Sequence, residues 1–153
     1  MSQQNHAPID PRGPRFGATI INVLSLITLY LALDSSTAAT AFVLLLVATA
    51  SFAIGATLGN SRHPFGWLFR KLVRPLLKPA SQLEDPRPPK FAQVVGLFVS
   101  VVGIALYLLQ VPYAVAYAAG ALVAATTLQA YFGYCLGCQI YVGLQRIGVI
   151  RQH

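Results

Sequence analysis

Residues 37–59, TAATAFVLLLVATASFAIGATLG, contain no Asp, Glu, Lys, Arg or His, and they are predominantly apolar. A helix needs ~20 such residues, at a rise of ~1.5 Å each, to span the ~30 Å hydrocarbon layer of a bilayer. Three other segments, residues 16–33, 91–110 and 112–134, have a similar length and also lack charged residues. The sequence therefore predicts an all-α membrane protein with four transmembrane helices.

The composition of the chain agrees with this prediction. Hydrophobic residues make up 56% of the 153 residues and charged residues only 10%, whereas an average soluble domain is roughly 25% charged. A soluble protein would need much more chain to cover four helices that are apolar on every side. We therefore expect residues 1–153 to form a single integral membrane domain. Fifteen polar, proline-rich residues precede the first apolar run, and this argues against a cleaved signal peptide.

The positions of the basic residues predict the orientation. The first two helices are joined by the short turn 34–36 and the last two by the short turn 110–112, so each pair forms a helical hairpin. All Lys and Arg residues lie outside these turns, at Arg12, Arg15, Arg62, Arg70, Lys71, Arg74, Lys78, Arg87, Lys90, Arg146 and Arg151. With four crossings they share one face, which the positive-inside rule makes cytoplasmic, together with both termini. Orientation thus explains the net charge of +7, and we expect no nucleic-acid partner.

The long middle connection contains a second membrane signal. Residues 64–78, PFGWLFRKLVRPLLK, mix aromatic and leucine side chains with spaced cations. Such a segment is typical of one that lies in the headgroup region of the bilayer, where anionic lipid attracts its cations. A plain surface connector is the preferred interpretation, and specific lipid recognition is the alternative.

The two halves of the chain resemble each other. Residues 10–16 (DPRGPRF) return as residues 85–91 (DPRPPKF), with five of seven positions identical, and residues 54–60 align with 132–138. We expect tandem repeats, at about 10–78 and 85–150, related by a pseudo-two-fold axis along the membrane normal. Within each box the Asp can pair with a nearby Arg or accept a hydrogen bond from a backbone amide.

Several small and polar residues within the spans have structural explanations. Gly55 is expected to let helices approach closely, and Gly133 is expected to pack or to break a helix. The polar residues Asn22, Gln93 and Gln129 are expected to form hydrogen bonds between helices rather than to bind a ligand.

The Cys135-Leu136-Gly137-Cys138 motif is the one chemical lead. A single helix over 112–150 would be about 58 Å long, far more than the membrane core, so a break is expected at Gly133 and Gly137. The break would place the cysteine pair at the cytoplasmic membrane boundary and at the start of a short interfacial helix. A helix N-terminus stabilises a thiolate there.

Three interpretations of the pair remain open. The first is a dithiol that exchanges electrons or sulfur with a soluble partner, because the cytosol keeps thiols reduced. The second is metal binding. A zinc site needs four ligands, and besides the two cysteines the chain offers only His6, His63 and His153. The third is packing of two small side chains. The first half of the chain has Thr57 and Asn60 at the matching positions, so that half does without thiols. This difference favours a chemical role for the cysteines over a packing role. We assign no metal site and no cofactor.

The boxes at 10–16 and 85–91, together with residues 132–141 (FGYCLGCQIY), resemble the bacterial membrane family of unknown function DUF4395. The resemblance extends from about Ile9 to Arg146. It implies a multi-pass protein of the bacterial inner membrane, loosely associated with thioredoxin-like and rhodanese-like (sulfurtransferase) neighbours. The only residues to which it assigns a role are Cys135 and Cys138.

The leading hypothesis is a membrane dithiol protein in which Cys135 and Cys138 are the redox pair and a thioredoxin-like or rhodanese-like protein is the partner. One alternative is a non-catalytic accessory subunit that binds another membrane protein, and another is a small transporter of a sulfur species. Enzymatic activity in the usual sense is undecided, and a homo-oligomer is compatible with the sequence.

Overall fold

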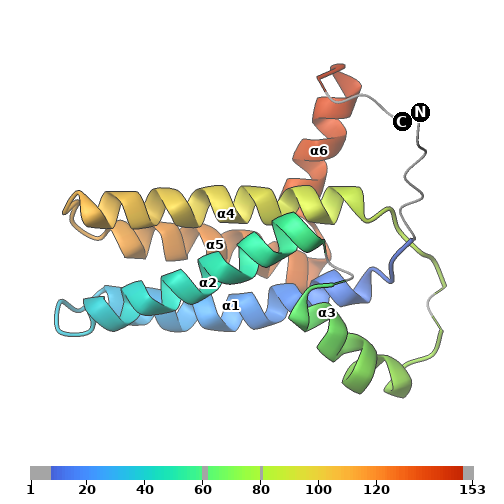
Figure 1. The fold of residues 1–153 in the computed structure, drawn as a ribbon, viewed down its shortest axis with the longest axis horizontal. Helices are drawn as coiled ribbons and strands as arrows, with labels where there is room; N and C mark the ends of the chain where they lie inside the picture. The colour runs from blue at the N-terminus through green and yellow to red at the C-terminus, as the bar shows by residue number, and fades with distance from the viewer. Residues whose placement is uncertain (1–7, 60–61, 80, 150–153) are drawn as a thin grey trace.

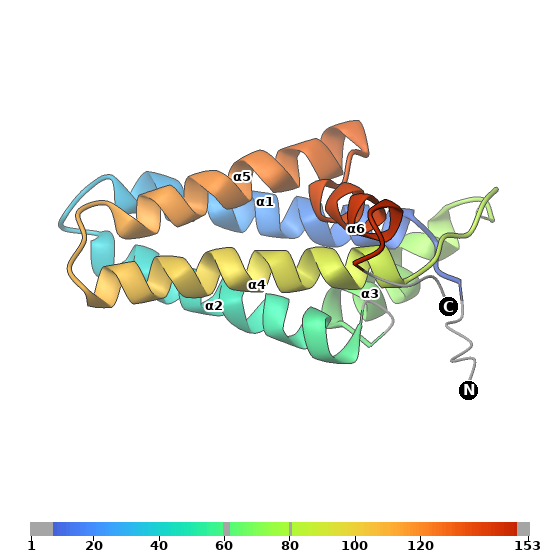
Figure 2. The same ribbon diagram turned by 90° about the horizontal axis from the view of Figure 1, so that it is seen from above.

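The computed structural model describes residues 8–59, 62–79 and 81–149. Four long helices, α1 (Arg12–Ala32), α2 (Ala38–Leu58), α4 (Arg87–Leu108) and α5 (Ala114–Phe132), run antiparallel in one bundle (Figure 1). The bundle order is α1, α2, α4, α5, and each helix packs against two neighbours (Figure 2).

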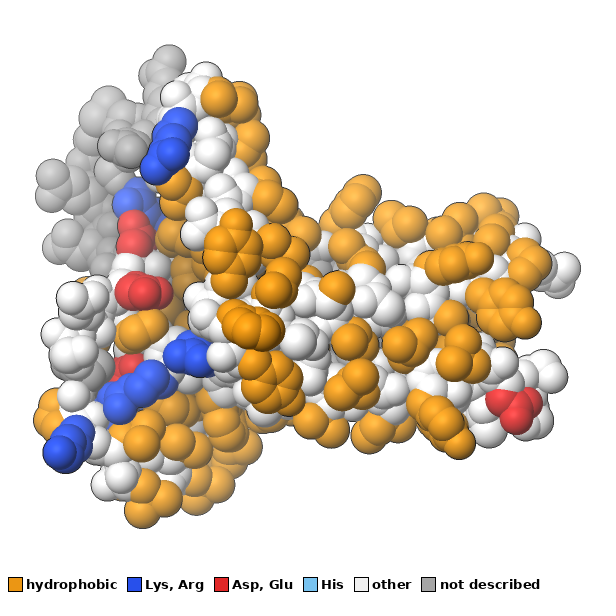
Figure 3. Space-filling view, turned by 180° about the vertical axis from the view of Figure 1, so that it is seen from behind, with side chains coloured by type: hydrophobic (Ala, Val, Ile, Leu, Met, Phe, Trp, Pro, Cys, Tyr) orange, Lys and Arg blue, Asp and Glu red, His pale blue; other side chains and the backbone are white. Residues whose placement is uncertain are grey.

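All four long helices are long and apolar enough to cross a membrane. Only 17% to 33% of the most apolar stretch of each helix is buried inside the protein, so large apolar side chains such as Phe98 and Tyr117 face outward. Figure 3 shows hydrophobic side chains along the bundle and Lys and Arg side chains gathered at one end. A bilayer accounts for an apolar outer surface of this kind, which indicates a membrane protein.

The helices start and end close to the predicted apolar segments, with one consistent difference. α1 and α4 begin at Arg12 and Arg87, about one turn before the apolar runs. The proline boxes therefore form the first helical turns, where the missing N–H of proline costs no hydrogen bond. Hydropathy detects the apolar part of such a helix and misses its polar first turn.

Small residues bring the helices close together. A Cβ on Gly96 of α4 would lie 2.4 Å from the ring of Phe52, and one on Gly103 would lie 2.4 Å from the Cβ of Ala118. Between α1 and α5, the Asn22 amide donates to the Thr127 hydroxyl at 2.8 Å. This confirms that Asn22 bonds between helices.

One end of the bundle, called the basic end here, contains the starts of α1 and α4, the ends of α2 and α5, and the remaining helices. Residues 62–79, called the basic segment, form α3 (Pro64–Leu68), the π-helical η1 (Phe69–Val73) and the 3-10 turn η2 (Arg74–Leu76). Phe69 is buried beside Gly13 and Phe16 of α1, while Trp67, Leu72 and Leu76 are exposed. The predicted amphipathic segment is therefore helical. α6 (Leu136–Arg146) leaves the same end at a steep angle to the bundle (Figure 1).

Candidate functional site

Cys135 and Cys138 lie where α5 gives way to α6, as the sequence predicts. The structure joins them in a disulfide, with their Cα atoms 5.1 Å apart. Both residues are partly exposed at the basic end.

The break before the pair comes from Gly133. This residue ends α5 with a φ of +67°, a left-handed conformation that glycine adopts without the steric cost of a Cβ. The Tyr134 N–H then donates back to the Leu128 carbonyl at 3.0 Å. From α1, Arg15 donates to the Ala130 carbonyl at 3.2 Å, which places a cation at the negative end of the α5 dipole. These contacts turn the chain sharply into the cysteine motif.

Cys135 is the N-cap residue of α6. Its Sγ accepts a hydrogen bond from the Cys138 N–H at 3.2 Å, in the position that a Ser or Asp oxygen takes at other helix starts. The first turn of α6 contains no acidic residue. No carboxylate in that turn therefore opposes the free N–H groups and the positive end of the helix dipole at this sulfur.

Gly137 fixes the motif against α4. A Cβ on Gly137 would lie 2.5 Å from the Cα of Ala92, so only glycine allows this approach. One turn later the Tyr141 ring packs against Phe91 with centroids 5.6 Å apart. The sequence predicts Gly137 as part of the break, whereas it lies within α6 and serves helix packing.

The two proline boxes have the same local structure. Asp10 accepts from the Arg12 backbone N–H at 3.0 Å and pairs with its guanidinium at 2.7 Å. Asp85 accepts from the Arg87 N–H at 2.9 Å and forms the matching ion pair. Both expected roles of the Asp residues are therefore confirmed. The side-chain hydrogen bond from Arg12 holds the pKa of Asp10 below its usual value.

The residues just before the boxes join them. Ile9 and Glu84 exchange two backbone hydrogen bonds in an antiparallel bridge, at 2.9 and 2.8 Å. Each residue directly precedes the Asp of its own box. The bridge thus ties the start of α1 to the start of α4 at the basic end.

His63 caps α3 and is buried, with 5% of its surface exposed. Its Nδ1 accepts from the Phe65 N–H at 3.1 Å, and its Nε2 lies 2.9 Å from the Ser51 carbonyl, to which it donates. Burial lowers the pKa of the imidazole, against the opposing effect of the Ser51 hydrogen bond. His63 is therefore a neutral capping residue. The sequence names it only as a candidate zinc ligand.

The described residues contain no cluster that could complete a metal site around it. Within residues 8–59, 62–79 and 81–149, no three His, Cys, Asp or Glu side chains are placed to hold a metal ion. His6 and His153 lie outside the described residues.

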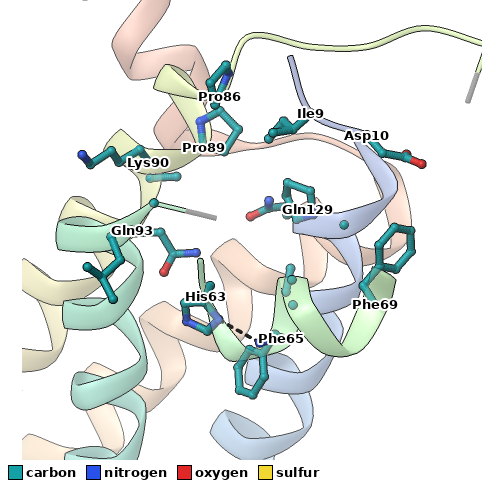
Figure 4. A pocket seen from close by; sticks show the side chains of 18 of the residues that line it. Ile9, Asp10, His63, Phe65, Phe69, Pro86, Pro89, Lys90, Gln93 and Gln129 are labelled. Carbon is teal, nitrogen blue, oxygen red and sulfur yellow. Dashed lines mark hydrogen bonds between the residues drawn. The ribbon is translucent and has the colours of Figure 1, made fainter. Parts of the chain in front are cut away.

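A cavity of about 540 Å³ lies at the basic end, and sequence reasoning missed it. It is lined from all four long helices and from the basic segment. Gln93 of α4 and Gln129 of α5 project into it, with His63 and Phe65 on its far side (Figure 4). That the two glutamines form hydrogen bonds between helices stays a prediction. The signal that could have found the cavity is the presence of amides on two different helices near the same end of the bundle.

The cavity and the cysteine motif share one wall. Ala92 lines the cavity and also contacts Gly137. The cysteines do not appear in the cavity lining. The basic end therefore presents two separate features, a partly exposed sulfur pair and a polar hollow.

Comparison with curated proteins finds no match. Comparison with solved structures also finds none. The family model described as "Domain of unknown function (DUF4395)" matches residues 9–146. Because this match covers most of the chain, the protein belongs to the DUF4395 family.

Proposed function

We propose that this protein is a membrane dithiol protein in which Cys135 and Cys138 exchange electrons or sulfur with a soluble thioredoxin-like or rhodanese-like partner. The cap geometry carries the proposal: the Cys135 sulfur accepts the Cys138 N–H at the start of α6. A negative charge on sulfur is stabilised at such a position. Partial exposure of both cysteines supports access by a partner.

The exchange proceeds in two steps. In the reduced protein the Cys135 thiolate attacks a partner disulfide, forming a mixed disulfide and releasing one partner sulfur as a thiolate. Cys138 then loses its proton and attacks Cys135, which forms the internal disulfide and releases the second partner sulfur. Two electrons pass from the cysteine pair to the partner, Cys138 releases one proton, and the partner leaves as two thiolates that solvent can protonate; reduction of the pair follows the same steps in reverse.

Sulfur transfer uses the same two residues. Cys135 takes the outer sulfur of a partner persulfide and releases the partner as a thiol. Cys138 attacks the resulting Cys135 persulfide, and hydrogen sulfide leaves as the disulfide forms. The cap contact at Cys135 supports this residue as the first attacker in both cases.

A redox titration tests the proposal. The protein is purified anaerobically in detergent, equilibrated in glutathione buffers, alkylated with a mass tag and weighed intact. We expect a two-electron transition near the cytosolic potential, roughly −220 to −320 mV. Thiols that never pair would make the cysteines packing residues, and the protein would then be an accessory membrane subunit.

Matched variants test the roles of the two cysteines. Cys138→Ser is expected to accumulate the mixed disulfide with a thioredoxin, because Cys135 can attack but nothing resolves the product. Cys135→Ser is expected to trap far less. Equal trapping by both variants would refute the assignment of Cys135 as the attacking residue.

The proposed architecture is a tandem repeat with a pseudo-two-fold axis through the basic end, inserted with that end in the cytoplasm. Support comes from the Ile9–Glu84 bridge, because a two-fold axis brings equivalent residues together in just such an antiparallel pair. In an experimental structure, residues 10–59 should superpose on 85–137 after a rotation of about 180°.

A further inference from the structure

The cavity at the basic end has a strongly cationic lining. Its basic side chains come from the basic segment and from the start of α4, and they are Arg70, Arg74, Arg87 and Lys90. Arg87 is paired with Asp85, so the positive excess comes from the other three. Among the described residues that line it, Asp10 is the single carboxylate, and it is already bound to Arg12. Figure 4 shows the Asp10 carboxylate directed away from the hollow. Such an excess of positive charge attracts anions.

The interior of the cavity adds neutral hydrogen-bonding groups. The Gln93 and Gln129 amides extend into it from the neighbouring helices α4 and α5 (Figure 4). Gly55 makes room for Gln93, because a Cβ at Gly55 would lie 2.7 Å from the Gln93 Oε1. Amide N–H groups and guanidinium groups are donors that suit phosphate oxygens.

Apolar side chains form the rest of the lining. Ile21, Phe52, Leu58, Phe65 and Phe69 contribute from α1, α2 and the basic segment. A small inorganic anion would leave this surface without a partner. The cavity volume also lies within the ~300–1,000 Å³ that is usual for small-molecule sites. The lining therefore fits an anion that carries an organic group.

We propose that this cavity binds a phosphate ester, with the phosphate at Arg70 and Arg74, the amides of Gln93 and Gln129 on its polar part, and the organic part against the phenylalanines. The phosphate ester is supplied either by the headgroup of an acidic phospholipid or by a soluble ester such as glycerol 3-phosphate. The site does not involve the cysteine pair, so binding is independent of the thiol exchange proposed above.

The sequence halves contribute unequally to the site. Gln93 and Gln129 in the second half align with Ala18 and Ser51 in the first, and all four residues line the cavity. The amides are thus present in the second half only, while Arg70 and Arg74 come from the basic segment at the end of the first half. An asymmetric site of this kind gives a bound ester one preferred orientation.

Binding is measured by native mass spectrometry on the full chain in a neutral detergent, with phosphatidylglycerol, phosphatidylcholine and glycerol 3-phosphate as separate probes. We expect phosphatidylglycerol to bind at least about tenfold more tightly than phosphatidylcholine. Arg74→Gln is expected to weaken it about tenfold, because it removes a charged hydrogen-bond donor from the phosphate. Arg74 is exposed, so this substitution should leave the fold intact.

Two further variants make the result specific. Gln129→Leu is expected to weaken binding without a change of charge, whereas Arg146→Gln on α6, which is exposed and does not line the cavity, should have no effect. Tight binding of glycerol 3-phosphate would identify a soluble ester as the source of the phosphate. Tight binding of phosphatidylglycerol without binding of glycerol 3-phosphate would identify the lipid.

The outcome that overturns the proposal is equal affinity for both lipids together with no effect of Arg74→Gln or Gln129→Leu. The double variant Cys135→Ser/Cys138→Ser should bind as the wild type does. Loss of thiol exchange and loss of ester binding are thereby separable results.

Discussion

His63 lies where α2 gives way to the basic segment, and both nitrogens of its ring are engaged. Nδ1 accepts from the Phe65 N–H, and Nε2 donates to the Ser51 carbonyl. A proton added to Nδ1 would remove the acceptor that caps α3 and would place a charge in a buried position. The residue therefore couples the junction between α2 and the basic segment to pH.

The lowered pKa of His63 predicts a loss of stability in mild acid. The unfolded chain binds a proton below its ordinary pKa of 6.5, whereas the folded protein binds it only at lower pH. Stability is then complete above pH 6.5 and falls as the pH drops toward the folded-state pKa. We expect the Tm in detergent to decrease between pH 7.5 and 5.5.

His63→Asn is the matched control for this pH effect, because an asparagine oxygen can accept from the Phe65 N–H and does not titrate. Its Tm should change less over the same range. His63→Ala should lower the free energy of unfolding by about 1 kcal/mol at pH 7.5, since it removes the cap. An identical pH slope in wild type and His63→Asn would show that other groups cause the effect.

At the scale of the element, α6 depends on one close approach to α4. Gly137 brings the cysteine turn against Ala92, and the Tyr141 and Phe91 rings hold the next turn. Arg15 fixes the preceding end of α5. The position of the sulfur pair is thus set by three helices, although both cysteines belong to one short motif.

Gly137→Ala is expected to disturb this docking. The added Cβ would lie 2.5 Å from the Cα of Ala92, so α6 must move at a cost of about 1–3 kcal/mol. Thermal unfolding in detergent and the alkylation rate of the reduced cysteines measure the effect, and both Tm and protection should fall. Gly143→Ala is the control on the same helix, because a Cβ there meets nothing within 4 Å. Equal behaviour of the two variants would contradict the packing role.

The elements show what the sequence could and could not predict. Four apolar runs, the break at Gly133 and the amphipathic basic segment follow from local patterns, and the structure has them all. The packing of α1 against both α2 and α5 is not a local property. The cavity depends on how Gln93, Gln129 and His63 meet from different elements, and no spacing along the chain contains that information. To predict Cys135 as the N-cap residue, one would need to know at which residue α6 begins.

At the scale of the whole molecule, charge is separated from apolar surface along the bundle axis. The cations gather at the basic end, and the hydrophobic surface covers the length of the bundle (Figure 3). The opposite end contains the short turns, including Asp34, whose carboxylate accepts from the Ser36 N–H at 2.9 Å. The membrane potential and the insertion machinery both favour basic loops on the cytoplasmic side.

Single cysteines at the two ends test the proposed orientation. In the Cys135→Ser/Cys138→Ser background, Ser35→Cys places a thiol in the turn between α1 and α2, and Lys78→Cys places one in the basic segment; both positions are exposed. A membrane-impermeant maleimide added to intact cells should label Ser35→Cys and should label Lys78→Cys only after permeabilisation. With four crossings, the two short turns lie on the opposite side of the membrane from all the basic segments. A reagent that stays on one side can therefore label only one of the two introduced cysteines. The reverse pattern would place the cysteine pair and the ester cavity outside the cytoplasm, and it would make cytosolic thioredoxin-like and rhodanese-like proteins inaccessible as partners.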